Sequence, residues 1–272
     1  MGLIYEPKGK AREYSPLALN VYTQGCEHGC SYCYNRTLGP WGLVPKVRDL
    51  TGLAREAARA DRQVFLSFIG DPYCPTEETA RNTRRALEVL RTAGCSVAIL
   101  TKGGMRALRD LDLFTAWPGG RIKVGATLTF DDPNLSMETE PGAATPDHRY
   151  LMLDELHAAG VRTFASIEPV LDPQESLECI RATLDCCDHY LIGALNHDSR
   201  WPISRATMGD FLLVAANMIV RSGRRVYVKR ETQGYLKLGG LTSEQCDQEA
   251  LTLPDRPRVV FRDELDLMEV HS

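Results

Sequence analysis

The sequence predicts an α/β fold, a partial (β/α)6 TIM-type barrel of parallel strands with a short C-terminal extension. Short apolar runs of strand length alternate with amphipathic stretches of helical period along most of the chain. Six such strand–helix units can be counted, fewer than the eight that close a full barrel. Polar residues follow the ends of successive strands, where the chemistry of such folds gathers.

The strands and helices follow one another in a regular order. Residues 1–15 are expected to be a polar lead-in. The predicted strands are Leu17–Tyr22, Val64–Ile69, Ser96–Thr101, Ile122–Thr129, Arg162–Ile167 and His189–Ile192, with a possible seventh at Arg225–Lys229. The predicted helices are Asp49–Ala60, Thr76–Ala93, Arg106–Thr115, Pro146–Ala159, Gln174–Asp185 and Ser204–Ser222.

Local signals support several of these elements. Val64–Ile69 is almost continuously apolar, as expected of a parallel strand buried on both faces. Thr76 is expected to cap the helix that follows it, and Gly94 to end that helix. Residues 130–145 are rich in proline and glycine and are expected to form a long loop.

Composition limits the class of protein. A chain of 272 residues with a net charge of −4 is expected to be one large globular unit without a general affinity for polyanions. Residues 1–200 are predicted to form the barrel, and 201–272 a helix, an extra strand and a tail packed on it. The first residues lack the apolar core of a secretory signal, and no apolar run is long enough to span a bilayer. Nine cysteines without a paired framework suit a reducing compartment, so a cytoplasmic location is predicted.

Three cysteines, Cys26, Cys30 and Cys33, follow the first predicted strand at spacings of four and three residues. A tight loop of this kind, eased by Gly29, can turn three thiolates toward one inorganic cluster. Because a four-iron cluster would then have one iron without a protein ligand, the loop indicates a metal site with an open position for chemistry.

Two other interpretations of the loop are weaker. A structural zinc site normally has four ligands, yet only one Cys-x-x-Cys pair is present and His28 would have to reach the metal from inside the same tight loop. A disulfide framework is disfavoured because three is an odd number. A non-catalytic metal-binding or electron-transfer module stays open as an alternative of another class.

The pattern C-x3-C-x2-C, with Tyr32 before its last cysteine, resembles the signature of the radical S-adenosylmethionine (radical SAM) superfamily. Further segments resemble its spore photoproduct lyase-like branch and appear in order along residues 16–195. These are Gly70-Asp71-Pro72-Tyr73, Leu100-Thr101-Lys102, Ala126-Thr127-Leu128-Thr129, Glu140-Pro141-Gly142 and Glu168-Pro169.

Two differences from that branch limit which of its properties can be expected of this chain. Only 25 residues precede Cys26, so the chain is expected to be a short form without the N-terminal region of photoproduct lyases. Those enzymes use a cysteine near the end of strand two as a hydrogen donor, whereas Cys74 lies beyond the Asp71-Pro72 step. Cys74 is therefore a candidate catalytic residue or a small buried hydrophobe, and thymine-dimer repair is not assigned.

The resemblance implies two cofactors, a [4Fe–4S] cluster held by Cys26, Cys30 and Cys33, and S-adenosylmethionine on the open iron. It also implies that the protein positions these cofactors while they supply the radical chemistry. The cofactor-binding residues that it implies are Tyr32, Gly70, Asp71, Lys102, Thr127, Thr129 and Glu168. Asn196 follows the sixth predicted strand, so it also lies at a strand end like these candidates.

Each of these residues also has a structural interpretation. Asp71 before a proline can initiate a turn, and Lys102 can be a solvated loop residue. Thr127 and Thr129 share one side of a strand and can be interior polar groups. Glu140 and Arg149 are expected to pair and close the long loop rather than touch the cofactor.

The sequence says less about the substrate and partners. Basic residues and two tyrosines alternate from Arg221 to Lys237, which favours a nucleobase, nucleotide or nucleic acid substrate. A solvated helix end is the alternative for this stretch, and a peptide or small metabolite the alternative substrate. The expected reaction type is a lyase, oxidoreductase or transferase step, and the expected partner is an external flavodoxin- or ferredoxin-like electron donor, with no membrane.

Overall fold

A computed structural model of the chain describes residues 2–37, 39, 41–195 and 199–236. Its centre is one eight-stranded sheet in the order β1-β2-β5-β6-β7-β8-β9-β10. The strands of this sheet are β1 Ile4–Tyr5, β2 Leu17–Leu19, β5 Val64–Leu66, β6 Val97–Thr101, β7 Ile122–Thr127, β8 Arg162–Val170, β9 His189–Ala194 and β10 Arg225–Val228. All neighbouring strands from β2 to β10 are parallel, and β1 alone runs antiparallel.

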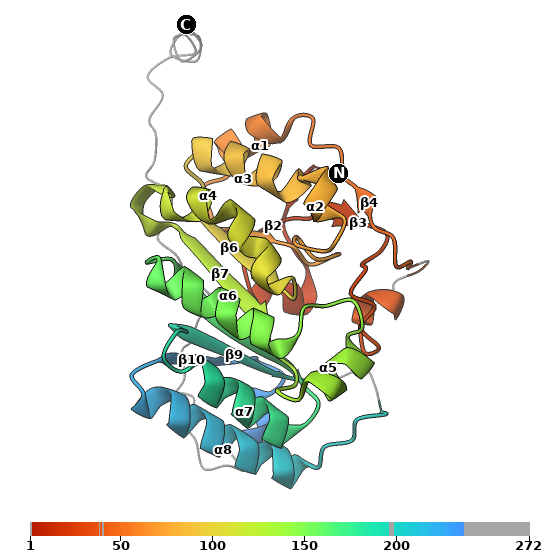
Figure 1. Cartoon of the computed structure of the whole chain (residues 1–272), viewed down its shortest axis with the longest axis vertical. Helices are drawn as coiled ribbons and strands as arrows, with labels where there is room; N and C mark the ends of the chain where they lie inside the picture. The colour runs from red at the N-terminus through yellow and green to blue at the C-terminus, as the bar shows by residue number, and fades with distance from the viewer. Residues whose placement is uncertain (1, 38, 40, 196–198, 237–272) are drawn as a thin grey trace, which may run out of the picture.

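The helices cover one face of this sheet, as Figure 1 shows. They are α1 Leu53–Arg59, α2 Glu77–Ala80, α3 Asn82–Thr92, α4 Leu111–Thr115, α5 Pro133–Thr139, α6 Pro146–Ala158, α7 Pro173–Thr183 and α8 Arg205–Arg221. Short 3-10 turns add η1 Gly9–Glu13, η2 Tyr34–Thr37, η3 Gly104–Asp110, η4 Pro118–Gly120 and η5 Gln233–Tyr235. The two end strands of the sheet do not pair with each other in the described residues, so the barrel is partial, as predicted.

Two apolar clusters hold the sheet. The larger one lies between the strands and the helices and contains most of the buried side chains. A smaller cluster on the other face is built around the aromatic residues Tyr14, Phe65, Phe164 and Tyr227. β5 and β7 are buried along their whole length, as expected of parallel strands covered on both faces.

The N-terminal part of the fold differs from the prediction. The expected polar lead-in contains β1, which pairs antiparallel with β2. The expected strand Leu17–Tyr22 divides, because only Leu17–Leu19 belongs to the large sheet while β3 Tyr22–Thr23 pairs with β4 Lys46–Val47. The chain thus leaves the sheet before the cysteine loop begins.

Three predicted helical or loop segments also differ. The expected helix from Thr76 is broken at Arg81, whose φ of 51° is left-handed, and the Thr76 side chain makes no cap. The expected loop 130–145 contains α5, which starts because the carboxylate of Asp132 accepts from the Asn134 amide at 2.7 Å and Pro133 occupies the first turn. The helix expected over Arg106–Thr115 is a 3-10 turn followed by α4.

The C-terminal elements that are described continue the sheet. The possible seventh strand is present as β10 and pairs in parallel with β9. α8 packs against α7 and β10. The predicted tail and Asn196 lie outside the described residues, and the boundary near residue 200 stays a prediction.

Candidate active site

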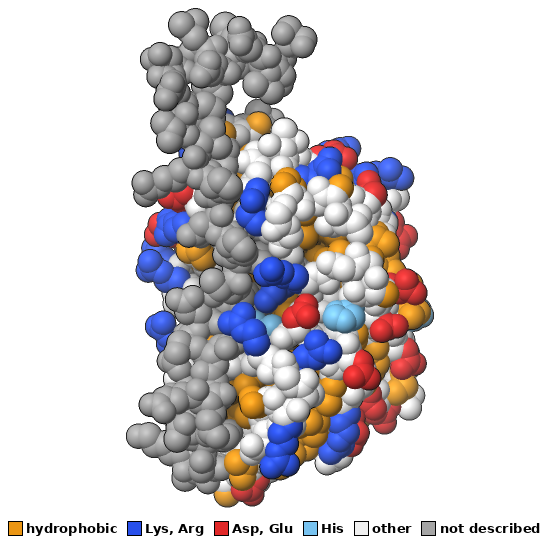
Figure 2. All heavy atoms as spheres, turned by 90° about the vertical axis from the view of Figure 1, so that its left-hand side faces the viewer, with side chains coloured by type: hydrophobic (Ala, Val, Ile, Leu, Met, Phe, Trp, Pro, Cys, Tyr) orange, Lys and Arg blue, Asp and Glu red, His pale blue; other side chains and the backbone are white. Residues whose placement is uncertain are grey.

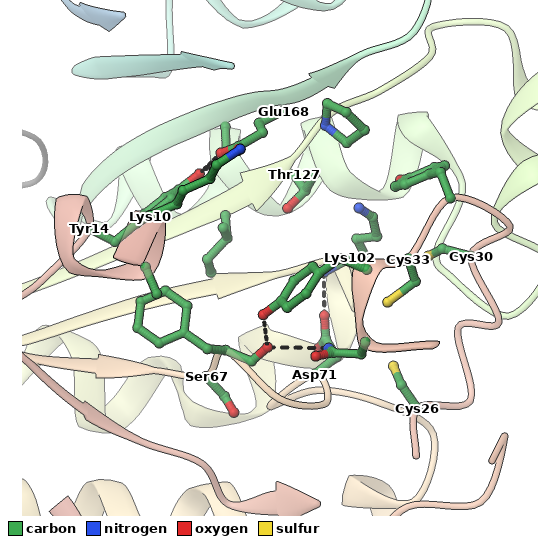
Figure 3. Close-up of a pocket in the computed structure, with 18 of the residues that line it drawn as sticks. Lys10, Tyr14, Cys26, Cys30, Cys33, Ser67, Asp71, Lys102, Thr127 and Glu168 are labelled. Carbon is green, nitrogen blue, oxygen red and sulfur yellow. Dashed lines mark hydrogen bonds between the residues drawn. The ribbon is translucent and has the colours of Figure 1, made fainter. Parts of the chain in front are cut away.

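A pocket of about 430 Å³ lies at the carboxyl ends of the parallel strands. Figure 3 shows the labelled cysteines at one end of it and Tyr14 with Glu168 at the other. Its lining includes nine of the predicted site residues, Cys26, Cys30, Tyr32, Cys33, Gly70, Asp71, Lys102, Thr127 and Glu168. Thr129 and Cys74 are fully buried and are not part of this lining.

The cysteine loop is braced by the segment that follows α5. The Ser31 amide donates to the Thr139 carbonyl at 2.8 Å, and the Gly142 amide donates to the His28 carbonyl at 3.0 Å. A Cβ on Gly142 would overlap the carbonyl oxygen of Glu27, so only glycine allows this close approach. The Glu140-Pro141-Gly142 segment therefore shapes the metal loop from outside it.

The donor set of the loop fits a cluster better than a single ion. Among the described residues no three His, Cys, Asp or Glu side chains are grouped as one metal ion needs. A zinc ion with bonds of about 2.3 Å would gather its thiolates closely, whereas a four-iron cluster takes its cysteines on separate irons. Burial raises the pKa of the Cys30 thiol to about 12, so without a metal the loop holds this thiol protonated.

His28 is occupied by structural contacts. Its Nδ1 lies 3.4 Å from Oδ2 of Asp71, and its Nε2 lies 3.3 Å from Nη2 of Arg106. Burial lowers the pKa of His28 to about 4, so the ring is neutral at physiological pH. Because both ring nitrogens face protein groups, the loop histidine is not available as a fourth ligand.

Asp71 organises the backbone at the ends of two strands. Its Oδ1 accepts from the Tyr73 amide at 2.8 Å and from the Thr101 hydroxyl at 2.6 Å. Its Oδ2 accepts from the Lys102 amide at 2.7 Å. Asp71 thus stabilises a turn, as in the structural interpretation of this residue. It also holds the backbone of Lys102 beside the pocket.

A buried charged network lies behind the cysteine loop. Arg149 and Glu140, 1% and 2% exposed, form an ion pair, as expected for the closure of this segment. Lys102 Nζ lies 3.3 Å from Oε1 of Glu140, and the hydroxyls of Thr129 and Tyr32 both bond to Glu140. Burial opposes ionisation of Glu140, but Arg149 and Lys102 outweigh it and hold its pKa at about 2.

This network changes the interpretation of two predicted residues. Lys102 is not a solvated loop lysine, because only 13% of its side chain is exposed and its ammonium faces Glu140. Thr129 supports Tyr32 and Glu140 from behind, whereas Thr127 lines the pocket itself. β7 ends at Thr127, so Thr129 lies beyond the strand that was expected to hold both threonines, and the two have different surroundings.

The opposite end of the pocket contains groups that sequence reasoning missed. Tyr14 donates to Glu168, and its hydroxyl lies 3.0 Å from that of Ser166. Lys229 donates to Glu168 Oε1 at 2.7 Å. Phe65 and Phe68 stack beside Tyr14 with ring centroids 4.5 Å apart. These residues could have been found in the sequence by their position at strand ends. Glu168 lies within β8 near its carboxyl end, and Lys229 directly follows β10.

The described part of the basic stretch, from Arg221 to Leu236, does not form one surface, and Lys237 lies outside the described residues. Arg224 and Arg225 lie at the start of β10, and Arg224 Nη1 is 3.9 Å from Asp188. Lys229 lies at the other end of that strand and is buried against Glu168. Tyr227 is also buried and donates to Glu13 at 2.7 Å. Basic residues that are close in the sequence therefore lie at opposite ends of β10.

Fold and site together define a class of protein, an α/β partial barrel with a three-cysteine loop lining its pocket. The family model described as "Radical SAM superfamily" matches residues 20–187, more than half of the chain. The chain belongs to the radical SAM superfamily, whose enzymes use a [4Fe–4S] cluster and S-adenosylmethionine. The resemblance to this superfamily that the sequence predicted is thus confirmed, while the roles of its individual residues stay predictions.

Curated relatives are similar over part of their length. The chain is 29% identical over 168 residues to the uncharacterized protein MJ0683 of Methanocaldococcus jannaschii, covering 60% of this chain and 63% of that one. It is 28% identical over 163 residues to the uncharacterized protein Rv2578c of Mycobacterium tuberculosis, covering 54% of this chain and 48% of that one. The chain therefore matches less than two thirds of the length of these relatives.

Solved structures show the same fold. SuiB of Streptococcus suis bound to S-adenosylmethionine superimposes with a TM-score of 0.60 at 12% identity, over 79% of this chain and 50% of that one. A spore photoproduct lyase mutant superimposes with a TM-score of 0.59 at 14% identity, over 79% of this chain and 76% of that one. At such identities the likeness concerns the fold alone.

One further property concerns membranes. No helix in the described part of the chain has both the length and the apolar character that a membrane crossing requires.

Proposed function

We propose that this protein cleaves S-adenosylmethionine reductively at Cys26, Cys30 and Cys33 and removes a hydrogen atom from a substrate held in the same pocket. The observation that carries this proposal is that the three cysteines line one end of a pocket whose other end is aromatic and polar. When bound, the [4Fe–4S] cluster and S-adenosylmethionine supply a 5′-deoxyadenosyl radical. The chain supplies binding, orientation and exclusion of water.

The residues between the two ends have separate tasks in this proposal. Lys102, fixed by Asp71 and Glu140, places a cation beside the cysteine loop, where the carboxylate of S-adenosylmethionine needs a partner. Gly70 lines the pocket with a φ of 75°, and a Cβ there would lie 3.2 Å from Tyr22 Cβ, so glycine allows this backbone conformation beside Tyr22. Thr127 offers a hydroxyl from β7 to the same space.

The aromatic end supports a nucleobase-containing substrate. Phe68 is stacked on Phe65 and lines the pocket, so a planar ring has an apolar face to pack against. Lys8 and Lys10 also line the pocket, and Lys8 offers a cation to a phosphate, whereas Lys10 already forms an ion pair with Glu231 in the same lining. Because the basic stretch at the C-terminal strand is dispersed, we propose a nucleoside or nucleotide rather than a long nucleic acid.

Deuterium transfer tests this function. The reconstituted protein is incubated anaerobically with S-adenosylmethionine, dithionite and pools of uniformly deuterated nucleosides, nucleotides, peptides or small metabolites. We expect deuterium in the 5′-deoxyadenosine formed with a nucleoside or nucleotide pool. Labelling from a peptide pool alone would assign the alternative substrate class. The absence of 5′-deoxyadenosine from protein with an intact, reducible cluster would contradict the enzymatic function.

A further inference from the structure

An ion pair faces the aromatic end of the pocket. Glu168 and Lys229 both line this pocket, and their side chains are 22% and 4% exposed. Glu168 Oε1 accepts from Lys229 Nζ at 2.7 Å, and Glu168 Oε2 accepts from the Tyr14 hydroxyl. A Cβ on Gly193 of β9 would lie 2.8 Å from Cδ of Glu168, so a larger residue there would displace the carboxylate. A carboxylate and an ammonium group therefore lie side by side in the pocket wall.

Contacts between η1 and the end of β10 hold this pair in place. Glu13 accepts from the Tyr227 hydroxyl at 2.7 Å and from the Arg230 amide at 3.0 Å. Lys229 lies between these two partners in the sequence, and its Nζ is 5.0 Å from the centre of the Tyr14 ring. The ammonium group is thus positioned before a ligand arrives.

The pair keeps hydrogen-bonding capacity for a ligand. A carboxylate offers about four lone pairs, and the described residues take two of those on Glu168, through Lys229 and Tyr14. An ammonium group has about three donors, and one of those on Lys229 is used by Glu168. A ligand at this wall therefore meets acceptors and donors next to each other.

Charge restricts the chemical class of group that fits between them. The carboxylate of Glu168 would repel a phosphate, and Lys229 would repel an ammonium group. A neutral group that both donates and accepts hydrogen bonds satisfies both side chains, and two neighbouring hydroxyls do so at each oxygen. Carboxylates bind the 2′-hydroxyl of ribose in this way in dinucleotide-binding folds.

An aromatic surface lies next to the pair. The rings of Tyr14 and Phe68 have centroids 6.0 Å apart, and Phe68 is stacked on Phe65. A nucleoside whose base packs on Phe68 can therefore place its sugar beside Glu168 and Lys229. On the face seen in Figure 2, basic and acidic side chains occur together, so that face offers no basic track to a longer nucleic acid.

We propose that Glu168 and Lys229 bind the 2′- and 3′-hydroxyls of a ribose in the substrate and so select ribonucleotides over 2′-deoxyribonucleotides. This inference rests on the proposed function, because it names which nucleotides that pocket takes. S-adenosylmethionine also contains a ribose, but Figure 3 shows Glu168 with Tyr14 at the end of the pocket away from the labelled cysteines. A 2′-deoxy sugar leaves the ion pair without one of its partners, which costs affinity.

Binding measurements compare the two sugars. The reconstituted, unreduced protein with saturating S-adenosylmethionine is titrated calorimetrically with AMP, GMP, CMP and UMP and with their 2′-deoxy counterparts. We expect at least one ribonucleotide to bind with a Kd about tenfold or more below that of its 2′-deoxy counterpart. Glu168→Gln and Lys229→Met should each lower this preference about threefold or more. Lys8→Ala is the matched control, because Lys8 lines the same pocket and its loss should weaken both sugars alike.

The Kd for S-adenosylmethionine is measured in the same variants. It should change less than twofold, which also shows that each variant is folded. A tenfold loss of this affinity in Glu168→Gln would assign the pair to the ribose of the cofactor and overturn the inference. Equal Kd values for the two sugars, an unchanged preference in both variants, or no binding of any of these nucleotides would overturn it as well. Cleavage of S-adenosylmethionine is measured separately, as 5′-deoxyadenosine formed with dithionite, so failure of the proposed function gives a different result.

Discussion

The two ends of the pocket are built by different means. At the cysteine end, the three cysteines come from eight consecutive residues, and the polar groups around them, such as Asp71 and Glu140, are hydrogen-bonded or paired with protein partners. At the aromatic end, Tyr14, Glu168 and Lys229 come from three distant parts of the chain and meet across the open side of the barrel. We propose that the first end is a preorganised cofactor site. The geometry of the second end depends on how the first and last strands are placed.

We propose different tasks for the two ends. A cofactor common to a superfamily can be held by a short local motif and a rigid surround. A substrate that differs between enzymes is better recognised by residues that are distant in the sequence and that the fold brings together. Variants at the two ends should therefore affect different measurements.

The largest effect is expected at the cysteine loop. Cys30→Ala removes one thiolate and should abolish cluster assembly, measured as iron and sulfide per protein chain after anaerobic reconstitution. Cys186→Ala is the matched control, since Cys186 is also buried but lies beyond α7. Full iron content in Cys30→Ala would remove this residue from the cluster.

The buried ion pair behind the loop should dominate stability. Glu140→Gln leaves the buried Arg149 without its counter-charge, and we expect a loss of about 3–5 kcal/mol in the free energy of unfolding, measured with guanidinium chloride. Glu178→Gln breaks an exposed pair with Arg181 and should cost less than about 1 kcal/mol. Similar losses in both variants would contradict a special role for the buried pair.

The same pair gives a pH dependence with a definite sign. The pKa of Glu140 is about 2 in the folded protein, below the usual value of about 4.3 for a glutamate. Its contribution to stability is therefore complete above about pH 4.5 and is lost as the pH falls toward 2. Wild type should lose more stability than Glu140→Gln over this interval, and parallel curves would refute the assignment.

A smaller and more specific effect is expected at the aromatic end. Tyr14→Phe removes the hydroxyl that donates to Glu168, and Lys229→Met removes its cationic partner. Each should raise KM for the substrate about tenfold, or about 1.4 kcal/mol, while the Kd for S-adenosylmethionine changes less than twofold. A parallel loss of cofactor affinity would assign Glu168 and its partners to the cofactor, as the sequence resemblance implies.

The smallest effect is expected at Cys74. Burial raises the pKa of this thiol, and the side chain is fully enclosed outside the pocket lining. Cys74→Ala should therefore reduce stability by about 1 kcal/mol and leave turnover within twofold. If turnover instead falls strongly and solvent deuterium in the product changes, Cys74 is a hydrogen donor, as its position in the sequence suggested.

The sequence predicted the parallel sheet and the cysteine end because both have local signatures. Apolar runs such as Val64–Leu66 and the spacing of Cys26, Cys30 and Cys33 are visible within a few residues. α5 was missed because its proline-rich composition resembles a loop until the Asp132 cap is seen. Tyr14 and Lys229 were missed as partners because they are 215 positions apart in the sequence, and only the fold of the whole sheet brings them to one carboxylate.

The central claim is that the cysteine end of this pocket cleaves S-adenosylmethionine. The most direct test is formation of 5′-deoxyadenosine by the reconstituted, dithionite-reduced protein, measured by mass spectrometry beside Cys30→Ala. We expect 5′-deoxyadenosine and methionine in equal amounts from wild type and neither from Cys30→Ala. Wild-type protein that holds an intact, reducible cluster, binds S-adenosylmethionine and yet forms no 5′-deoxyadenosine would contradict the account.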